Sequence, residues 1–342
     1  MSGFDIRIEG HAGRLTFRRP KALNALSAEM SIAAERALDE WRDDPAVSLI
    51  IIDAEGEKAF CAGGDIADLY AHGTDGDFDF GREFWRQEYR LNLKIADYPK
   101  PIVSLMQGFT MGGGVGVGCH ASHRIVGETS KMAMPECGIG LIPDVGGTYL
   151  LGRAPVGIGV YYGLTGARMN AADAIHAGFA DYFVPQTDWT DLIAKLVETG
   201  KTSVIADYEV SAPIPPLQTI GFGKMAGCFA ADTVTGILTA LSRQTDEAAE
   251  KAAKAIRRAS PIALDCTLQL IRQAAQLSLG DALMHEYRFA HRSQDQADFL
   301  EGIRAQIIDK DFTPNWRYTV GAVPTEVTSE LLAPLGALEW KA

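Results

Sequence analysis

Two acidic residues and two glycine-rich turns are the features of this sequence best suited to chemistry. Glu136 and Asp144 each follow a proline. Five glycines lie within residues 112–118, and a further glycine pair occupies residues 63–64. A carboxylate can act as a general base or a nucleophile, and glycines leave backbone N–H groups open to a ligand. These residue types point to a site at which a ligand meets both main chain and carboxylate.

The glycine run at residues 112–118 has two interpretations. Each glycine costs backbone entropy and buries no side chain, so the run suits a place where a ligand approaches the main chain. If a helix begins here, its first N–H groups are unpaired and its dipole is positive, which favours a developing negative charge. The alternative is a glycine-rich bend in a tightly packed core. The acidic residues downstream favour a site.

Together, the two glycine turns predict an oxyanion hole. Two backbone N–H donors from separate loops can hold a carbonyl oxygen as it becomes negative, because their dipoles are fixed in advance. With a carboxylate nearby as base or nucleophile, this arrangement predicts acyl or enolate chemistry without a metal or a redox cofactor.

Short apolar runs that alternate with helical patterns predict an α/β fold around these turns. Residues 4–8 and 14–17 alternate like a β-hairpin, and residues 47–52 form the continuous apolar run of a buried strand. Ser27 is placed to cap a helix. Further elements are expected at residues 79–96 (helix), 102–105 (strand), 155–164 and 171–177 (helices) and 180–184 (strand).

The second part of the chain is predicted to be helical. Residues 186–216 are interpreted as a looser segment that contains several prolines, and most of the chain beyond them has helical patterning. Ser260 followed by Pro261 predicts the start of one helix. We therefore expect a core domain with the acyl-chemistry site over residues 1–216 and a helical region over residues 217–342.

Composition excludes several classes of protein. The chain has 342 residues, 47% of them hydrophobic and 22% charged, as in an ordinary globular protein with a sizeable core. A net charge of −12 argues against nucleic-acid and anionic-membrane partners, since both require basic surface. Five cysteines without a CxxC motif suggest neither a disulfide framework nor a zinc site. No signal-peptide pattern or membrane-spanning apolar run is found, so the cytoplasm is the expected location.

Three other motifs are weaker matches. Residues 116–121 fit G-x-G-x-x-A, but the expected strand ends about ten residues too early for a dinucleotide site. Residues 200–202 resemble the tail of a P-loop without its first glycine. His120 and His123 have no serine or carboxylate spaced to form an obvious triad, so core or capping positions are expected for both.

The glycine turns and the Pro-Glu motif resemble the crotonase (enoyl-CoA hydratase/isomerase) superfamily. The matching stretches are Phe60-Cys61-Ala62-Gly63-Gly64-Asp65-Ile66, Met111-Gly112-Gly113-Gly114, and Pro135-Glu136 with Gly146-Gly147-Thr148. The resemblance implies an α/β fold, a ClpP-like spiral of β-β-α units with a helical C-terminal region, that binds an acyl-CoA thioester.

The same resemblance implies roles for individual residues. The N–H groups of Gly64 and Gly113 would hold the thioester oxygen. Contacts to CoA are implied for the basic segment 18–26, which includes Ala25, and for Ala62, Asp65 and Ile66.

Position 116 departs from the hydratases of this superfamily. Those enzymes carry one glutamate three residues after the middle glycine and a second in the Pro-Glu motif, and hydration needs both. Here the first position is Gly116, which has no side chain. Simple hydration is therefore not the expected reaction.

A narrower resemblance, to the 3-hydroxyisobutyryl-CoA hydrolase branch, covers nearly the whole chain. The matching stretches are residues 84–92, 111–116, 133–136, 140–147, 285–288 and 301–304, the last running on to 308–311. The branch implies hydrolysis of 3-hydroxyisobutyryl-CoA to 3-hydroxyisobutyrate and CoA, a reaction of valine degradation. CoA is then part of the substrate, and no separate cofactor or metal is expected.

In this branch Glu136 would either attack the thioester carbonyl, to give a mixed anhydride, or activate water to do so. Asp144 would orient Glu136, the water or the substrate hydroxyl, and Glu88 would contact the substrate. A purely structural interpretation instead makes Glu88 a surface residue of its helix and makes Asp144 a cap of the following helix.

Two other functions stay open. The chain could be a hydratase or isomerase of the same superfamily, or a non-catalytic acyl-CoA-binding protein on the same scaffold. Binding alone needs neither Glu136 nor Asp144, so their presence argues against the second. Members of the superfamily are commonly trimers or hexamers, so a homo-oligomer is a further expectation.

Overall fold

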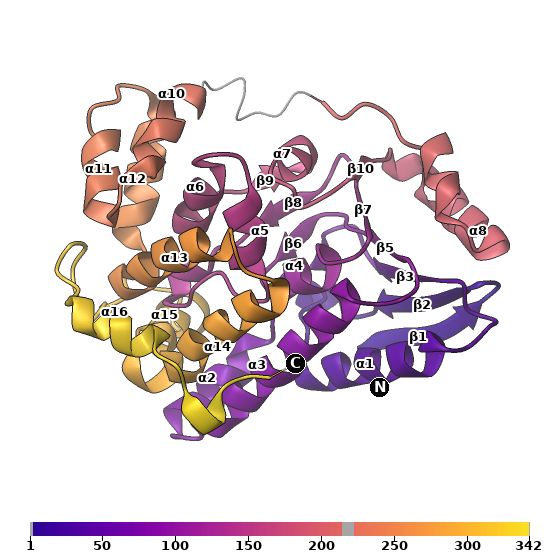
Figure 1. Cartoon of the computed structure of the whole chain (residues 1–342), viewed down its shortest axis with the longest axis horizontal. Helices are drawn as coiled ribbons and strands as arrows, with labels where there is room; N and C mark the ends of the chain where they lie inside the picture. The colour runs from indigo at the N-terminus through magenta and orange to yellow at the C-terminus, as the bar shows by residue number, and fades with distance from the viewer. Residues whose placement is uncertain (1–2, 214–221, 342) are drawn as a thin grey trace. The chain divides into compact units, whose positions relative to one another are not determined.

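The computed structural model describes residues 3–213 and 222–341 (Figure 1). Two compact units are distinguished, each assembled from separate stretches of the chain. The first comprises Met1–Gly64, Gln87–Ala133 and Met169–Pro216, and the second comprises Asp65–Arg86, Met134–Arg168 and Leu217–Ala342. The predicted division at 216–217 falls in residues 214–221, outside the described part of the chain, and stays a prediction.

Unit 1 is built on two sheets. The six-stranded sheet has the order β1-β2-β3-β5-β7-β10, and the four-stranded sheet has the order β4-β6-β8-β9. The larger sheet contains β1 (Phe4–Glu9), β2 (Ala12–Phe17), β3 (Leu49–Ala54), β5 (Ile102–Leu105), β7 (His123–Val126) and β10 (Tyr182–Phe183). The smaller contains β4 (Ala59–Cys61), β6 (Phe109–Met111), β8 (Lys131–Ala133) and β9 (Met169–Asn170). Figure 1 shows β1, β2 and β3 side by side.

The chain order of these strands confirms the predicted α/β class. Strands come in pairs followed by a helix, as β3-β4 then α2 (Ile66–Thr74), β5-β6 then α4 (Gly113–Gly118), and β7-β8 then the 3₁₀ helix η2 (Glu136–Ile139). The first strand of each pair joins the larger sheet in parallel, and the second joins the smaller sheet. This is the repeated β-β-α pattern that was expected.

Local signals placed the first elements correctly. The β1–β2 hairpin forms, and α1 (Ala28–Arg42) begins where Ser27 Oγ accepts a hydrogen bond from Met30 N–H at 3.3 Å. The remaining helices with residues in unit 1 are η1 (Pro20–Ala22), α3 (Phe78–Ala96, shared with unit 2), α7 (Ala171–His176), η3 (Gln186–Asp188), α8 (Trp189–Thr199) and η4 (Thr202–Asp207).

The interpretation of residues 186–216 as a loose segment is wrong, because they contain α8. The side chains of Leu192 and Leu196 are fully buried in a cluster with Leu49, Ile51 and Val103 of the larger sheet. This apolar face, which is buried only in the tertiary structure, stabilises a helix that its local sequence signals weakly.

Unit 2 is mostly helical, as predicted for the C-terminal part of the chain. The helix α13 (Pro261–Ala274) begins at the Ser260 cap with Pro261 in its first turn and packs against α5 (Gly147–Arg153) and α6 (Ile158–Thr165). Unit 2 also contains α2 and η2. Its helices in the C-terminal part of the chain are, in addition, α10 (Phe222–Ala226), η5 (Gly227–Ala230), α11 (Val234–Leu241), α12 (Glu247–Arg258), α14 (Leu279–Gln296), α15 (Phe299–Ile303), the π-helical turn η6 (Arg304–Ile308), α16 (Thr325–Leu332) and η7 (Gly336–Leu338). Figure 1 shows α11 and α12 side by side.

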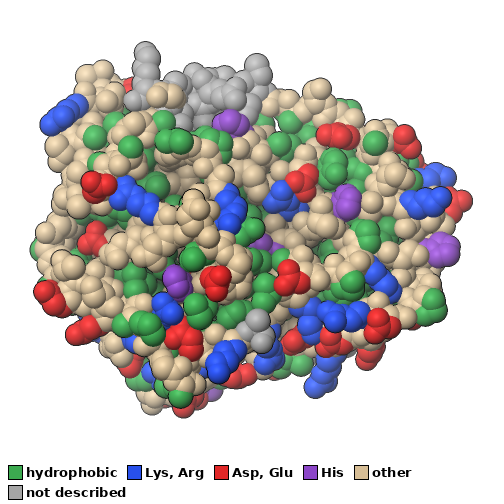
Figure 2. All heavy atoms as spheres, in the orientation of Figure 1, with side chains coloured by type: hydrophobic (Ala, Val, Ile, Leu, Met, Phe, Trp, Pro, Cys, Tyr) green, Lys and Arg blue, Asp and Glu red, His purple; other side chains and the backbone are tan. Residues whose placement is uncertain are grey.

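Charge on one face of the molecule is mixed in sign. On the face shown in Figure 2, acidic and basic side chains are interspersed, so the net charge of −12 is not gathered there into one acidic region. Within the described residues, no helix combines the length and the apolar character needed to cross a membrane.

A buried histidine in unit 2 predicts acid sensitivity. Burial, together with the positive charges of Arg82 and Arg292, lowers the pKa of His291 to about 4. The unfolded chain therefore binds a proton on this residue between about pH 6.5 and pH 4 that the folded chain does not, so stability falls as the pH falls through this range. We expect His291 to contribute a drop of about 2 kcal/mol in unfolding free energy between pH 7 and pH 5, measured as the difference between the urea-unfolding pH profiles of the wild type and His291→Gln. An unchanged pH dependence in the variant would contradict the assignment.

Candidate active site

The two predicted glycine turns lie side by side in unit 1. The segment after β4 is tied to residues 23–26, since Ala62 N–H donates to the Leu23 carbonyl at 3.0 Å and Leu26 N–H donates to the Gly63 carbonyl at 2.9 Å. A Cβ atom placed on Gly113, the first residue of α4, would lie 3.4 Å from the Gly64 nitrogen. The structure therefore brings together the two N–H groups that the sequence predicted as oxyanion donors.

The packing interpretation of the glycine run is confirmed for Gly114, and the site interpretation stays a prediction for Gly113. A Cβ atom on Gly114 would overlap the Cys61 carbonyl oxygen, so this glycine permits close packing of α4 on β4. A Cβ atom on Gly113 would meet the Glu88 carboxylate instead. The helix that follows is six residues long and fully buried, with Gly116 in its middle.

Glu88 is a buried residue of unit 1, which rules out the surface interpretation. It is 2% exposed on α3, and its Oε1 atom lies against Gly113 at the start of α4. Since burying a carboxylate is costly, a position beside two glycine turns is more consistent with a functional group than with a packing residue.

The segment 18–26, for which the family resemblance implies contacts to CoA, has an unusual backbone conformation. Leu23 and Asn24 both have positive φ, 50° and 56°, and the Asn24 side chain donates to the carbonyls of Glu55 and Ala59 at 3.0 and 2.9 Å. Ala25 and Ala62 are thereby held on neighbouring, hydrogen-bonded segments. Asp65 and Ile66, the other predicted contacts, form the start of α2 and belong to unit 2.

Part of the basic charge in this loop is already paired. Arg18 Nε lies 2.7 Å from Glu55 Oε1. Lys21 and Lys58 line a surface cavity of about 400 Å³ together with Glu55 and Glu57. Lys21 and Lys58 are therefore two cations beside this cavity.

The predicted catalytic carboxylates are both buried in unit 2. Glu136 is 5% exposed and Asp144 is 3% exposed. Glu136 begins η2, which is fastened by two hydrogen bonds, from Leu141 N–H to the Glu136 carbonyl at 3.1 Å and from Ser260 N–H to the Cys137 carbonyl at 2.9 Å. The backbone that carries Glu136 is therefore tied to the start of α13.

Two glycines allow the C-terminal helices to approach the Glu136 segment closely. A Cβ atom on Gly302 of α15 would overlap the Ile139 carbonyl at the end of η2. A Cβ atom on Gly140 would lie 2.5 Å from the Asp298 carbonyl carbon, and Gly140 has a φ of 76°. The position of η2 thus depends on backbone-to-backbone packing against α15.

Gly302→Ala is expected to destabilise the protein by about 1–3 kcal/mol, because backbone cannot move aside as a flexible side chain can. Chemical unfolding measures the loss. Gly138→Ala is the matched control, since a Cβ atom at Gly138 meets nothing within 4 Å. Equal stability of the two variants would show that the close approach is unimportant.

The interpretation of Asp144 as a helix cap is wrong. The helix α5 begins after a tight turn in which Gly147 N–H donates to the Asp144 carbonyl at 2.6 Å. The N–H groups of Gly146 and Thr148 donate to the carboxylate of Glu286, at 2.8 and 2.9 Å. Sequence reasoning did not single out Glu286, although it lies in one of the stretches, 285–288, that carry the family resemblance.

The cysteines near these segments are poor nucleophiles. Burial raises the pKa values of Cys61, Cys119 and Cys137 to about 12, so these thiols stay protonated at neutral pH. A covalent cysteine mechanism is therefore disfavoured. His120 is buried, as expected of a core histidine, whereas His123 is only partly buried and stacks on Tyr182 with ring centroids 6.0 Å apart. Within the described residues, no group of three or more His, Cys, Asp or Glu side chains could hold a metal ion.

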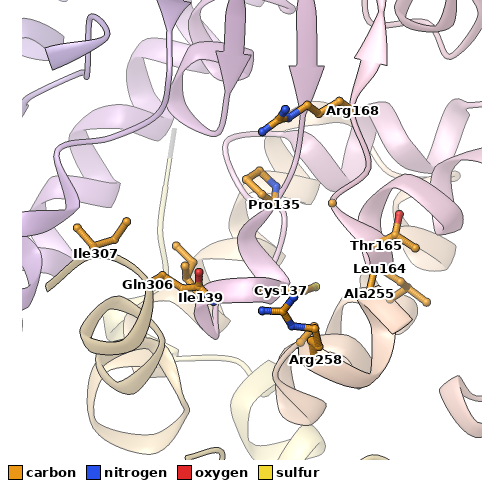
Figure 3. Close-up of a pocket in the computed structure, with 13 residues that line it drawn as sticks. Pro135, Cys137, Ile139, Leu164, Thr165, Arg168, Ala255, Arg258, Gln306 and Ile307 are labelled. Carbon is orange, nitrogen blue, oxygen red and sulfur yellow. The ribbon is translucent and has the colours of Figure 1, made fainter. Parts of the chain in front are cut away.

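A cavity of about 610 Å³ in unit 2 lies beside η2, the helix that begins at Glu136 (Figure 3). Pro135 and Cys137 line it, while Glu136 between them does not. Arg168 and Arg258 line it as well, and Figure 3 shows them on opposite sides of Pro135 and Cys137. The Glu136 side chain therefore lies outside this cavity.

Solved structures similar to this chain are named as CoA enzymes. A structure named as an enoyl-CoA hydratase from Rhodobacter sphaeroides 2.4.1 is 52% identical, with a TM-score of 0.95 and 100% of both chains covered. One named as a carnitinyl-CoA dehydratase from Mycobacterium thermoresistibile is 42% identical, with a TM-score of 0.93 and coverage of 98% and 97%. The fold is therefore the crotonase fold, as expected.

Similar sequences carry a different name. The protein named 3-hydroxyisobutyryl-CoA hydrolase, mitochondrial, from Gallus gallus is 38% identical over 96% of this chain and 88% of its own length. The protein named 3-hydroxyisobutyryl-CoA hydrolase 1 from Arabidopsis thaliana is 37% identical over 88% and 83%. The sequence model of one family, described as enoyl-CoA hydratase/isomerase, matches residues 12–332. The chain belongs to the enoyl-CoA hydratase/isomerase family.

Proposed function

We propose that this protein is a thioester hydrolase that converts 3-hydroxyisobutyryl-CoA and water into 3-hydroxyisobutyrate and CoA. The observation that carries the proposal is the set of buried carboxylates. Glu136 and Asp144 are both buried, whereas the position on α4 at which hydratases carry their first glutamate is Gly116. The names of the animal and plant relatives supply the acyl group.

In the proposed reaction the N–H groups of Gly64 and Gly113 stabilise the thioester oxygen as negative charge develops on it. Glu136 either attacks the carbonyl carbon, forming an anhydride that water then opens, or removes a proton from the attacking water. In both routes a C–O bond forms, the C–S bond breaks, and CoA leaves as a thiolate that takes up a proton. Asp144 orients the reacting groups, and Glu88 binds the 3-hydroxyl of the substrate.

In this proposal CoA binds to the segments at residues 18–26 and 62–66. Ala25 and Ala62 contact it through neighbouring backbone, with Asp65 and Ile66 at the start of α2 as further contacts. Lys21 and Lys58 are the cations that the nucleotide phosphates meet. CoA belongs to the substrate, and the mechanism calls on no separate cofactor.

Hydratase or isomerase activity is the second candidate. The name enoyl-CoA hydratase, carried by the 52% identical structure, favours it. Hydration of a double bond uses one group to activate water and another to handle the proton at Cα, and Gly116 supplies neither. Isomerisation needs a single base, for which Glu136 suffices. A non-catalytic acyl-CoA-binding protein is the remaining alternative.

Release of thiol separates these functions. The purified protein is mixed with 3-hydroxyisobutyryl-CoA, 3-hydroxypropionyl-CoA or crotonyl-CoA, and free CoA is followed with a chromogenic disulfide. The hydrolase releases thiol from the hydroxyacyl thioesters only. Loss of the enoyl absorbance of crotonyl-CoA without thiol release would overturn the proposal in favour of a hydratase. Inactivity on all three, with binding retained, would favour the acyl-CoA-binding protein.

Two further parts of the proposal concern the protein in the cell. We propose a cytoplasmic location and a homo-oligomer, the second supported by the family resemblance. Several vertebrate relatives are named as mitochondrial, so fractionation of the source cells is the test of location. Analytical ultracentrifugation of the full chain tests the oligomer, and a monomer at micromolar concentration would contradict it.

A further inference from the structure

Glu286 is a fully buried carboxylate whose place in the fold links the C-terminal helices to Asp144. It lies on α14 and is 0% exposed. Its carboxylate accepts hydrogen bonds from Gly146 N–H at 2.8 Å, from Thr148 N–H at 2.9 Å and from the Thr148 hydroxyl. The two backbone donors belong to the first residues of α5, where N–H groups have no partner within the helix.

The backbone between Asp144 and these donors is strained. Val145 has a φ of 53°, and Gly146 follows it with a φ of 78°. A left-handed conformation is rare for a β-branched residue and is energetically costly. Such a turn persists only when its surroundings hold it, and the bonds to Glu286 begin at Gly146, one residue after the strained valine.

We propose that Glu286 is a positioning residue for Asp144, because its carboxylate fixes the strained turn that directs the Asp144 side chain. This inference rests on the proposed function, in which Asp144 orients the reacting groups. Glu286 itself is assigned no contact with the substrate.

Electrostatics agree with a close coupling of the two residues. The pKa of Glu286 is raised to about 8, chiefly by burial and to a smaller extent by the negative charge of Asp144, while the bonds from Thr148 and Gly146 lower it. Because the Asp144 charge is close enough to act on the Glu286 carboxyl, the two residues are coupled through the field as well as through the backbone.

Glu286→Gln is the sharpest single change. Above about pH 8, where Glu286 is ionised, both of its oxygens accept hydrogen bonds. A glutamine has one acceptor oxygen, so at that pH its NH₂ group must face either the Gly146 N–H or the Thr148 donors, and one end of the turn is released. We expect kcat for thiol release to fall at least about 10-fold, because small misplacements of a reacting group are costly, while KM stays within about 3-fold. Thr148→Val removes one donor and should act in the same direction, whereas Thr148→Ser keeps the hydroxyl and should restore most of the rate.

A double-mutant cycle with Asp144→Asn separates positioning from general support of the fold. If Glu286 acts through Asp144, Glu286→Gln costs little more once Asp144 has been changed, and the two effects on kcat are not additive. Fully additive losses of kcat would overturn the proposal. So would a fall in kcat that is fully explained by a fall in the fraction of folded protein.

Hydrogen exchange tests the same contacts without any activity assay. Amides of the peptide containing Gly146 and Thr148 should exchange at least about 10-fold faster in Glu286→Gln, while those of α12 are unchanged. Unaltered exchange in the variant would overturn the proposal. If the wild-type protein released no thiol but the exchange behaved as expected, the failure would lie in the proposed reaction and not in the role of Glu286 in holding the turn.

Discussion

Replacing Glu136 with Gln lowers kcat for release of CoA from 3-hydroxyisobutyryl-CoA by about 10²–10⁴-fold, the range that a positioned base or nucleophile contributes. The amide is nearly the same size as the carboxylate but neither accepts a proton at neutral pH nor attacks a carbonyl. Because Glu136 is 5% exposed and its backbone is bonded to Leu141, the substitution should leave η2 in place. Thiol release under saturating substrate measures the loss.

The matched control is Glu250→Gln on α12, where the side chain is exposed and the same chemical change should leave kcat unaltered. Binding of the acyl-CoA to Glu136→Gln, measured by calorimetry, should remain close to that of the wild type. A variant that retained a third or more of the wild-type rate would exclude Glu136 as base and as nucleophile. Loss of binding together with rate would mean instead that Glu136 supports the site structurally.

Gly113→Ala is expected to lower kcat by about 10²–10³-fold, as removal of one oxyanion donor does in other acyl-transfer enzymes. The added methyl group would lie 3.4 Å from the Gly64 nitrogen and against the Glu88 carboxylate. It therefore occupies space beside the donors in which the thioester oxygen is proposed to sit. Steady-state kinetics with 3-hydroxyisobutyryl-CoA measures the effect.

Two further variants identify the cause of that loss. Gly227→Ala is the control for the substitution itself, since a Cβ atom there meets nothing within 4 Å, and its kcat should equal that of the wild type. Gly113→Ala combined with Glu88→Ala removes the overlap with the carboxylate. Since Glu88 is itself proposed to bind the substrate, the reference for this double variant is Glu88→Ala alone. If the added methyl group slows Glu88→Ala as much as it slows the wild type, it acts on the oxyanion donors. A rate equal to that of Glu88→Ala would show that displacement of Glu88 was the cause.

The helices and strands that sequence reasoning predicted correctly are those whose signals lie in neighbouring residues of the chain. The Ser27 cap of α1, the Pro261 start of α13 and the alternation in the β1–β2 hairpin each depend on residues close together in the chain. The elements it did not place, such as β9 with two residues and α8, depend on pairing or burial against distant segments. Short strands have little local preference, so the sheet that they join decides them.

The sequence by itself determined the chemical groups of the site. The motifs around Gly64, Gly113 and Glu136 carry the family resemblance, and Gly116 distinguishes the chain from the hydratases, because these properties belong to single residues at fixed spacings.

The tertiary structure alone decided how these groups are held. It buried Glu88 against Gly113 and assigned close packing to Gly114. It also placed Glu286 on the turn after Asp144, across 138 residues of sequence from Thr148. The physical reason is that a side chain's partners depend on which distant segments the fold brings within hydrogen-bond reach, and no periodicity or spacing along the chain encodes them.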